Sequence, residues 1–92
     1  MRLVDLLGYN RSKMAIYIEI DKLSEDEYFA VFSYRDEEGR VGQIKLDKKL
    51  GKTTLVKAAA GDEQGGLYTR ASYKILEHWR NGKLPDSTCW AS

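Results

Sequence analysis

The side chains best suited to chemistry are few in this chain. Its 92 residues include one histidine, His78, and one cysteine, Cys89. A thiol nucleophile needs a base beside it, and that base needs an orienting partner. A Cys89–His78 pair oriented by Asp86 would meet this requirement, but nothing near Cys89 in the sequence marks a thiol with a lowered pKa. We therefore expect no enzyme, with His78 structural and Cys89 a small buried side chain.

Metal and phosphate sites have little support in the sequence. Structural zinc needs about four Cys or His ligands, and one histidine and one cysteine do not supply them. The run Gly51-Lys52-Thr53-Thr54 resembles the end of a phosphate-binding loop, but Leu46 stands where that pattern requires its first glycine. The lysine also precedes a predicted strand, whereas the pattern places it at a helix N-terminus. We expect no metal and no cofactor.

Charge is divided unevenly along the chain, although the net charge is only +1. Residues 21–38 hold seven acidic and two basic side chains, whereas residues 39–92 hold ten basic and five acidic ones. Such a division favours complementary binding surfaces. We predict that the acidic side chains contact a basic protein partner. They are Asp21, Glu25, Asp26 and Glu27, which precede one predicted strand, and Asp36, Glu37 and Glu38, which follow it.

A basic cluster leaves an alternative open. Lys45, Lys48, Lys49 and Lys52 lie close together in the sequence, and tyrosines lie on the predicted strands before them. Basic side chains beside aromatic ones on a sheet can bind nucleic acid. The nearly neutral total charge and the acidic, glycine-rich segment 61–66 argue against this function. Nucleic-acid binding through residues 45–52 is therefore the alternative.

The strands that position these groups follow from hydrophobic periodicity. Alternation predicts strands over residues 14–20 and 41–46. Residues 28–35 are apolar on both faces, which is typical of a central strand. Residues 53–58 favour a fourth strand, although the alanines that follow could begin a helix instead. Glycines and acidic residues between the strands predict tight turns.

Two helices are predicted around these strands. Leu3, Leu6 and Leu7 have helical spacing and are followed by Gly8, which predicts a short N-terminal helix. A longer helix is predicted over residues 67–81, with an apolar stripe formed by Tyr68, Ala71, Ser72, Ile75, Leu76 and Trp79. The predicted fold is a single α+β domain over residues 1–92. It is an antiparallel three- to four-stranded meander, with the short N-terminal helix and the long C-terminal helix packed on one face.

Further features of the sequence bear on the cellular location of the protein and on the packing of its C-terminal tail. No apolar run approaches the ~20 residues that span a bilayer, and the N-terminus lacks a cleavage site for export. A single cysteine forms no disulfide within the chain. We expect a cytoplasmic protein that does not enter membranes; its oligomeric state stays open. Trp90 predicts that the tail packs back on the domain.

The C-terminal stretch resembles the last helix and tail of small immunity proteins encoded beside bacterial polymorphic toxins, including contact-dependent growth-inhibition systems. The resemblance rests on Ala71-x-x-x-Ile75-Leu76-Glu77-x-Trp79-x-x-Gly82-x-Leu84-Pro85-Asp86, followed by Cys89-Trp90. It implies a cytosolic inhibitor that forms a tight complex with one toxin domain, very often a nuclease. A nuclease binds phosphate with basic residues, so carboxylates could occupy its active site. The family supplies no catalytic residues.

Overall fold

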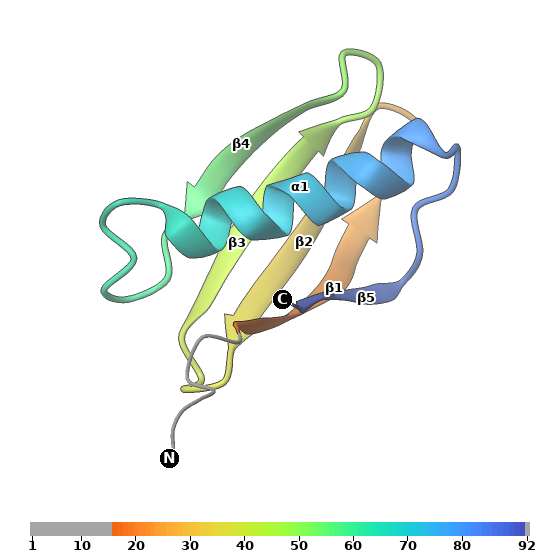
Figure 1. Cartoon of the computed structure of the whole chain (residues 1–92). Coiled ribbons are helices and arrows are strands. Elements are labelled where there is room, and N and C mark those ends of the chain that lie inside the picture. Colours follow the sequence, from red (N-terminus) through yellow and green to blue (C-terminus); the bar gives the residue numbers. More distant parts are fainter. Residues whose placement is uncertain (1–15, 92) are drawn as a thin grey trace.

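The computed structural model describes residues 16–91, which form one sheet and one helix in two layers (Figure 1). The elements are β1 (Tyr17–Glu25), β2 (Phe29–Asp36), β3 (Val41–Asp47), β4 (Lys52–Lys57), α1 (Gly66–Arg80) and β5 (Ser87–Ala91). All neighbouring strands are antiparallel, and their order across the sheet is β4-β3-β2-β1-β5. Strand β2 is therefore central, as its sequence predicts. Within the described range, no helix is both long and apolar enough to cross a membrane.

The predicted architecture is wrong in its elements. The sheet has five strands rather than three or four, and α1 is followed by another strand instead of ending the fold. The fifth strand is the tail, which pairs with β1 in a regular antiparallel register from Tyr17↔Ala91 to Asp21↔Ser87. The segment that could have begun a helix is strand up to Lys57. The predicted helix over residues 3–7 lies outside the described residues.

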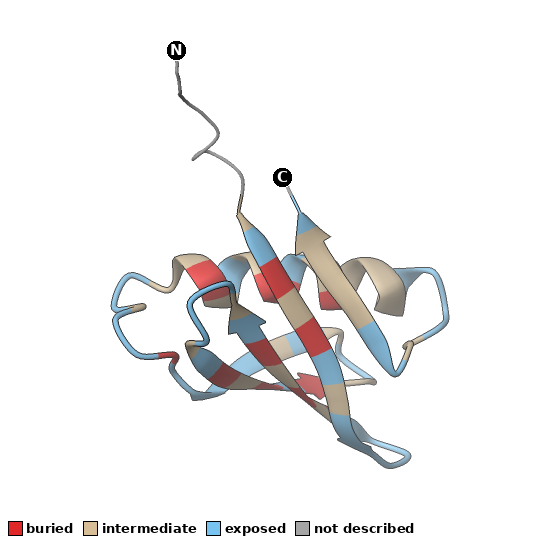
Figure 2. Cartoon of the chain, turned by 90° about the horizontal axis from the view of Figure 1, so that it is seen from below, coloured by how far each residue is buried: buried red, intermediate tan, exposed pale blue. Residues whose placement is uncertain are grey.

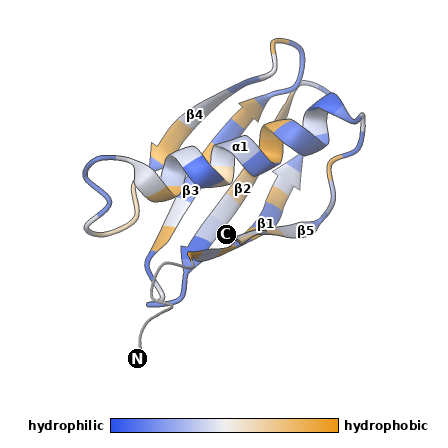
Figure 3. Cartoon of the chain, in the orientation of Figure 1, coloured by the Kyte–Doolittle hydropathy of each residue, from blue (hydrophilic) through white to orange (hydrophobic). Residues whose placement is uncertain are grey.

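The core lies between α1 and one face of the sheet. Buried and more exposed side chains alternate along the three inner strands (Figure 2), and β3 alternates between hydrophobic and hydrophilic residues (Figure 3). The buried strand residues are Ile18, Ile20, Ala30, Phe32, Tyr34, Ile44 and Leu46. In α1, the predicted stripe is confirmed by buried Ala71, Ser72 and Ile75, and the helix also buries Leu67. Burial of these apolar side chains is the main stabilising contribution.

Two glycines let large rings reach the sheet. A Cβ atom on Gly42 would overlap the phenol ring of Tyr34, which is fully buried. A Cβ atom on Gly51 would overlap the indole ring of Trp79, and Gly51 also has φ +66°. The Trp79 Nε1–H donates a hydrogen bond to the Lys48 carbonyl oxygen at 2.8 Å. The β3–β4 turn is thereby attached to the last turn of α1.

The other face of the sheet carries no helix in the described part of the chain (Figure 1). We call it the open face. The Thr53 hydroxyl lies 3.2 Å from the Tyr68 hydroxyl of α1, so Thr53 is on the helix side. Because side chains alternate along a strand, Lys52 and Thr54 lie on the open face. By the same alternation, Tyr17, Phe29 and Lys45 share that face.

The tail is attached at several points, which confirms that it packs on the domain. The rings of Trp90 and Tyr73 meet edge to face, with centroids 5.6 Å apart. The His78 Nε2 atom lies 2.9 Å from the Thr88 hydroxyl, which joins α1 to β5. These contacts place Thr88 and Trp90 on the helix side of the sheet. Cys89, between them, therefore faces the open side.

Candidate functional site

The predicted acidic residues lie mainly at two opposite ends of the sheet. Glu25 ends β1 and is followed by Asp26 and Glu27 in the β1–β2 turn. Asp36 ends β2 and is followed by Glu37 and Glu38 in the β2–β3 connection. Strand β2 separates the two groups along its whole length. Asp21 lies within β1, where its Oδ1 accepts a hydrogen bond from the Ser87 hydroxyl at 2.6 Å. The seven carboxylates do not converge on one point.

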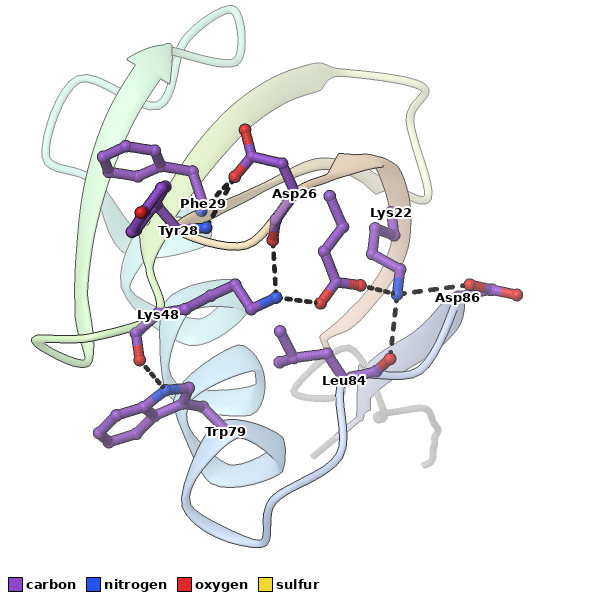
Figure 4. Close-up of polar contacts among 9 residues, drawn as sticks. Lys22, Asp26, Tyr28, Phe29, Lys48, Trp79, Leu84 and Asp86 are labelled. Atoms are coloured by element: carbon purple, nitrogen blue, oxygen red, sulfur yellow. Dashed lines mark hydrogen bonds and ion pairs between the residues drawn. The ribbon is translucent and has the colours of Figure 1, made fainter.

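At the first end, Glu25 is held between two lysines, Lys22 and Lys48, both labelled in Figure 4. Its carboxylate oxygens lie 2.6 Å from the Lys22 Nζ and 2.6 Å from the Lys48 Nζ. Hydrogen bonds from Lys22 and then Lys48 lower the pKa of Glu25. Lys22 also donates to the Leu84 carbonyl oxygen at 3.1 Å, and Lys48 to the Asp26 carbonyl oxygen at 2.8 Å. Glu25 therefore joins two turns and the chain leading to β5, and its charge is already balanced within the protein.

Asp26 has a structural role in the same turn. Its Oδ1 accepts the backbone N–H groups of Tyr28 and Phe29, each at 2.8 Å (Figure 4). The bond from the Phe29 N–H, followed by that from Tyr28, lowers the pKa of the Asp26 carboxyl. Such an Asx turn fixes the chain direction between two strands. Glu27, beside it, is exposed.

At the second end, Asp36 is also used internally. Its side chain is 7% exposed and accepts the Arg40 Nε–H at 2.7 Å and the Arg40 backbone N–H at 2.9 Å. Burial alone would raise the pKa of Asp36, but the hydrogen bonds from the backbone and guanidinium of Arg40 outweigh it, and the pKa is lowered. Arg40 is thus committed to Asp36. The Arg40 Nε lies farther from the Glu38 carboxylate, at 3.6 Å, and the Glu38 side chain is 78% exposed.

These residues border a groove, which we call the acidic groove. It has a volume of about 280 Å³ and is lined by Ile16, Tyr17, Asp36, Glu37, Glu38, Arg40 and Leu67. Tyr17 is 39% exposed at its edge. Arg40 balances Asp36, so the two neighbouring glutamates give the groove a net negative charge. Exposed carboxylates around an aromatic and an aliphatic side chain suit a partner's lysine or arginine.

Sequence reasoning named the carboxylates of this groove but missed its other walls. Tyr17 and Leu67 are 50 residues apart in the sequence, and only the crossing of α1 over the sheet brings them together. Arg40 had a local indication, because it lies four residues after Asp36 across a glycine turn. A basic residue at that spacing across a hairpin can pair with the carboxylate that begins the turn.

A second groove, the basic groove, lies on the open face at the other end of the sheet. It has a volume of about 280 Å³ and is lined by Phe29, Lys45, Asp47, Leu50, Lys52 and Thr54. The Lys45 Nζ lies 4.3 Å from the centroid of the Phe29 ring, a cation–π contact. Asp47 is occupied with the N–H groups of Lys49 and Leu50, each at 2.9 Å. Of the predicted lysine cluster, Lys45 and Lys52 line this groove, whereas Lys48 and Lys49 do not, and Lys48 pairs with Glu25 instead.

The residues best suited to catalysis are not brought together. His78 contacts Thr88 on the helix side, whereas Cys89 faces the open side of the same strand. There Cys89 is the largest cause of the raised pKa of the Tyr17 hydroxyl, since a thiolate disfavours a second negative charge nearby. The Asp86 side chain is 98% exposed and lies 3.5 Å from the Lys22 Nζ. Over residues 16–91, no cluster of three or more histidine, cysteine or acidic side chains could hold a metal ion.

Comparison with known proteins adds no relative. No protein-family model matches the sequence, and neither the curated proteins nor the solved structures give a match. The two grooves and the sheet that presents them are therefore the features that bear on function.

Proposed function

We propose that this chain is a cytosolic binding protein without catalytic activity, an inhibitor of a basic protein partner such as the toxin domain of an immunity pair. The supporting observation is the acidic groove. Its two exposed glutamates, Glu37 and Glu38, are not needed to hold the turn, because Asp36 and Arg40 already do so. Exposed carboxylates whose internal ion pairs are long, as the 3.6 Å pair between Glu38 and Arg40 is, can bind a cation at little cost to the fold.

The groove offers a partner two kinds of contact. The charge of a partner's lysine or arginine would meet Glu37 and Glu38. Ile16, which is only partly buried, supplies an apolar surface for the aliphatic part of that side chain. For a nuclease, whose active site must be basic to bind phosphate, such a contact would block the substrate.

Co-expression tests the biological part of this proposal. The product of the adjacent gene should be toxic when expressed alone and harmless when expressed with this chain. An adjacent product that is harmless alone contradicts the immunity proposal.

Binding kinetics test the surface. The double variant Glu37→Lys/Glu38→Lys should reduce the association rate with the basic partner by about tenfold or more at low salt, because opposite charges steer association. The matched control is Glu27→Lys with Asp86→Lys, which makes the same charge change at exposed positions distant from the groove. Equal losses in both variants would show that only total charge matters and that the groove is not the contact.

Nucleic-acid binding remains a second candidate because of the basic groove. Phe29 offers a ring for base stacking, and Lys45, Lys52 and the Thr54 hydroxyl could contact phosphate. Fluorescence anisotropy with a labelled single-stranded oligonucleotide at low salt tests it. Binding in the micromolar range should be weakened by Lys45→Ala/Lys52→Ala but not by Lys74→Ala/Lys83→Ala. No binding of the wild type at micromolar protein removes this candidate.

A further inference from the structure

The two edges of the sheet are built differently. Strand β4 forms one edge and carries Lys52 and Lys57 at its ends, and its pairing with β3 contains a register shift. Charged side chains and irregular pairing are the usual means by which an edge strand avoids pairing with another chain. Strand β5 forms the other edge. It carries no charged residue and no proline, and its register with β1 has no shift.

From this contrast we propose that β5 pairs antiparallel with β5 of a second copy of the chain, so that two sheets become continuous. This inference goes beyond the proposed function and does not depend on it. Within the described residues, β5 has a strand on one side only, β1, so its outer backbone groups are available for a second ladder. A two-fold axis through this edge gives each copy the same contacts.

Charge selects β5 over β4 for pairing with an identical strand. In an antiparallel pair of two β4 strands centred on their midpoint, Lys52 would lie opposite Lys57 at both ends, and opposed like charges destabilise a pair. In a pair of two β5 strands centred on Cys89, Ser87 lies opposite Ala91 and Thr88 opposite Trp90. No charges are opposed. Charge repulsion therefore opposes pairing of two β4 strands and does not oppose pairing of two β5 strands.

Aromatic side chains beside β5 would add to the contact. Tyr73 is 55% exposed and packs against the half-buried Trp90 at this margin of the helix layer. A second copy would cover part of both rings, and burial of apolar surface favours association. One short strand pair buries less than the roughly 1,000 Å² of a stable interface, so we expect a dissociation constant between about 10 μM and 1 mM.

The register of this pair can be read from Cys89. The centred pairing sets the two Cys89 residues directly opposite one another on the open face, where Cα atoms across an antiparallel pair lie about 4.5–5.5 Å apart. This spacing falls within the range of a disulfide. Oxidised glutathione should then link the two copies: two thiols give up two electrons and two protons, and the oxidant is reduced to two molecules of glutathione.

Sedimentation velocity between about 10 μM and 1 mM tests the association, and the whole chain is used throughout. The wild type should pass from monomer to dimer over this range. Cys89→Lys places two lysines opposite one another and should raise the dissociation constant at least tenfold. The matched control is Thr54→Lys, which adds the same charge to the open face of the other edge and should leave the dimer unchanged. Circular dichroism establishes that both variants fold.

Two further measurements fix the pairing. An equimolar mixture of Cys89→Lys and Cys89→Glu should dimerise again, because the opposed residues now carry opposite charges. Oxidised glutathione should cross-link the wild type at concentrations where it dimerises, and not in urea. A wild type that stays monomeric at 1 mM overturns the proposal. It is equally overturned by a dimer that survives Cys89→Lys, or by one that forms no Cys89–Cys89 link.

Discussion

Replacing Gly51 by alanine probes the contact between the β3–β4 turn and the helix. Gly51 has φ +66°, and an alanine Cβ there would overlap the Trp79 ring. The ring cannot move away freely, because its Nε1–H is bonded to the Lys48 carbonyl oxygen at 2.8 Å. The substitution therefore combines an unfavourable backbone conformation with a steric clash and a weakened hydrogen bond.

The size of the effect follows from these three contributions. Alanine in the left-handed region costs about 1–2 kcal/mol. Forcing an added methyl group into a packed site costs about 1–3 kcal/mol, and a lost hydrogen bond about 1 kcal/mol. We expect Gly51→Ala to lower the free energy of unfolding by about 3–6 kcal/mol. Gly39→Ala is the matched control, since φ is +83° and nothing lies within 4 Å of its added Cβ. It should cost only about 1–2 kcal/mol.

Urea unfolding followed by far-UV circular dichroism measures both variants. With a slope of about 1–1.5 kcal/mol per molar urea, the two midpoints should differ by about 1–4 M. Repeating Gly51→Ala in a Trp79→Leu background should reduce its cost to that of Gly39→Ala. Equal midpoints for the two glycine variants in the wild-type background would refute the reasoning, because the clash with Trp79 would then contribute nothing.

Three other results are expected. The lowered pKa values of Asp36, Glu25 and Asp26 mean that ionised carboxylates stabilise the fold above their unfolded pKa near 4; the melting temperature should therefore fall as the pH drops from about 5 towards 3. Asp36→Asn should lower the melting temperature at pH 7, whereas at pH 3 the melting temperatures of the variant and the wild type should be similar. A difference that is the same at all pH values would contradict the ion pair between Asp36 and Arg40. Deleting residues 86–92 removes β5 and the Trp90 ring and should lower the free energy of unfolding by about 3–5 kcal/mol in urea titrations, whereas an unchanged midpoint would show that the tail contributes no packing.

The local sequence predicted the first four strands and the long helix because their patterns are contained in short windows. Met14 to Ile20 alternates, β2 is apolar on both faces, and α1 has a clear stripe. The predicted end of the first strand at Ile20 is wrong, since β1 continues to Glu25. For β4, the β-branched residues Thr53, Thr54 and Val56 favoured strand, and the structure agrees. These features depend on neighbours within a few residues.

Strand β5 could not be predicted in the same way. Its five residues contain no alternation of apolar and polar side chains, and its partner β1 lies far away in the sequence. This segment is a strand because it pairs with β1, and the intrinsic strand propensity of its own residues does not predict it. The role of Glu25 was hidden for a similar reason, because its partner Lys48 lies 23 residues away in the sequence.

The long separation between β1 and β5 has a consequence for the order of folding. Asp21 and Ser87 are bonded to each other across 66 residues of sequence. During synthesis on the ribosome, the outer side of β1 therefore remains without its neighbour until Ala91 has emerged. In that interval the nascent chain exposes an unpaired edge that a chaperone or another nascent chain could bind.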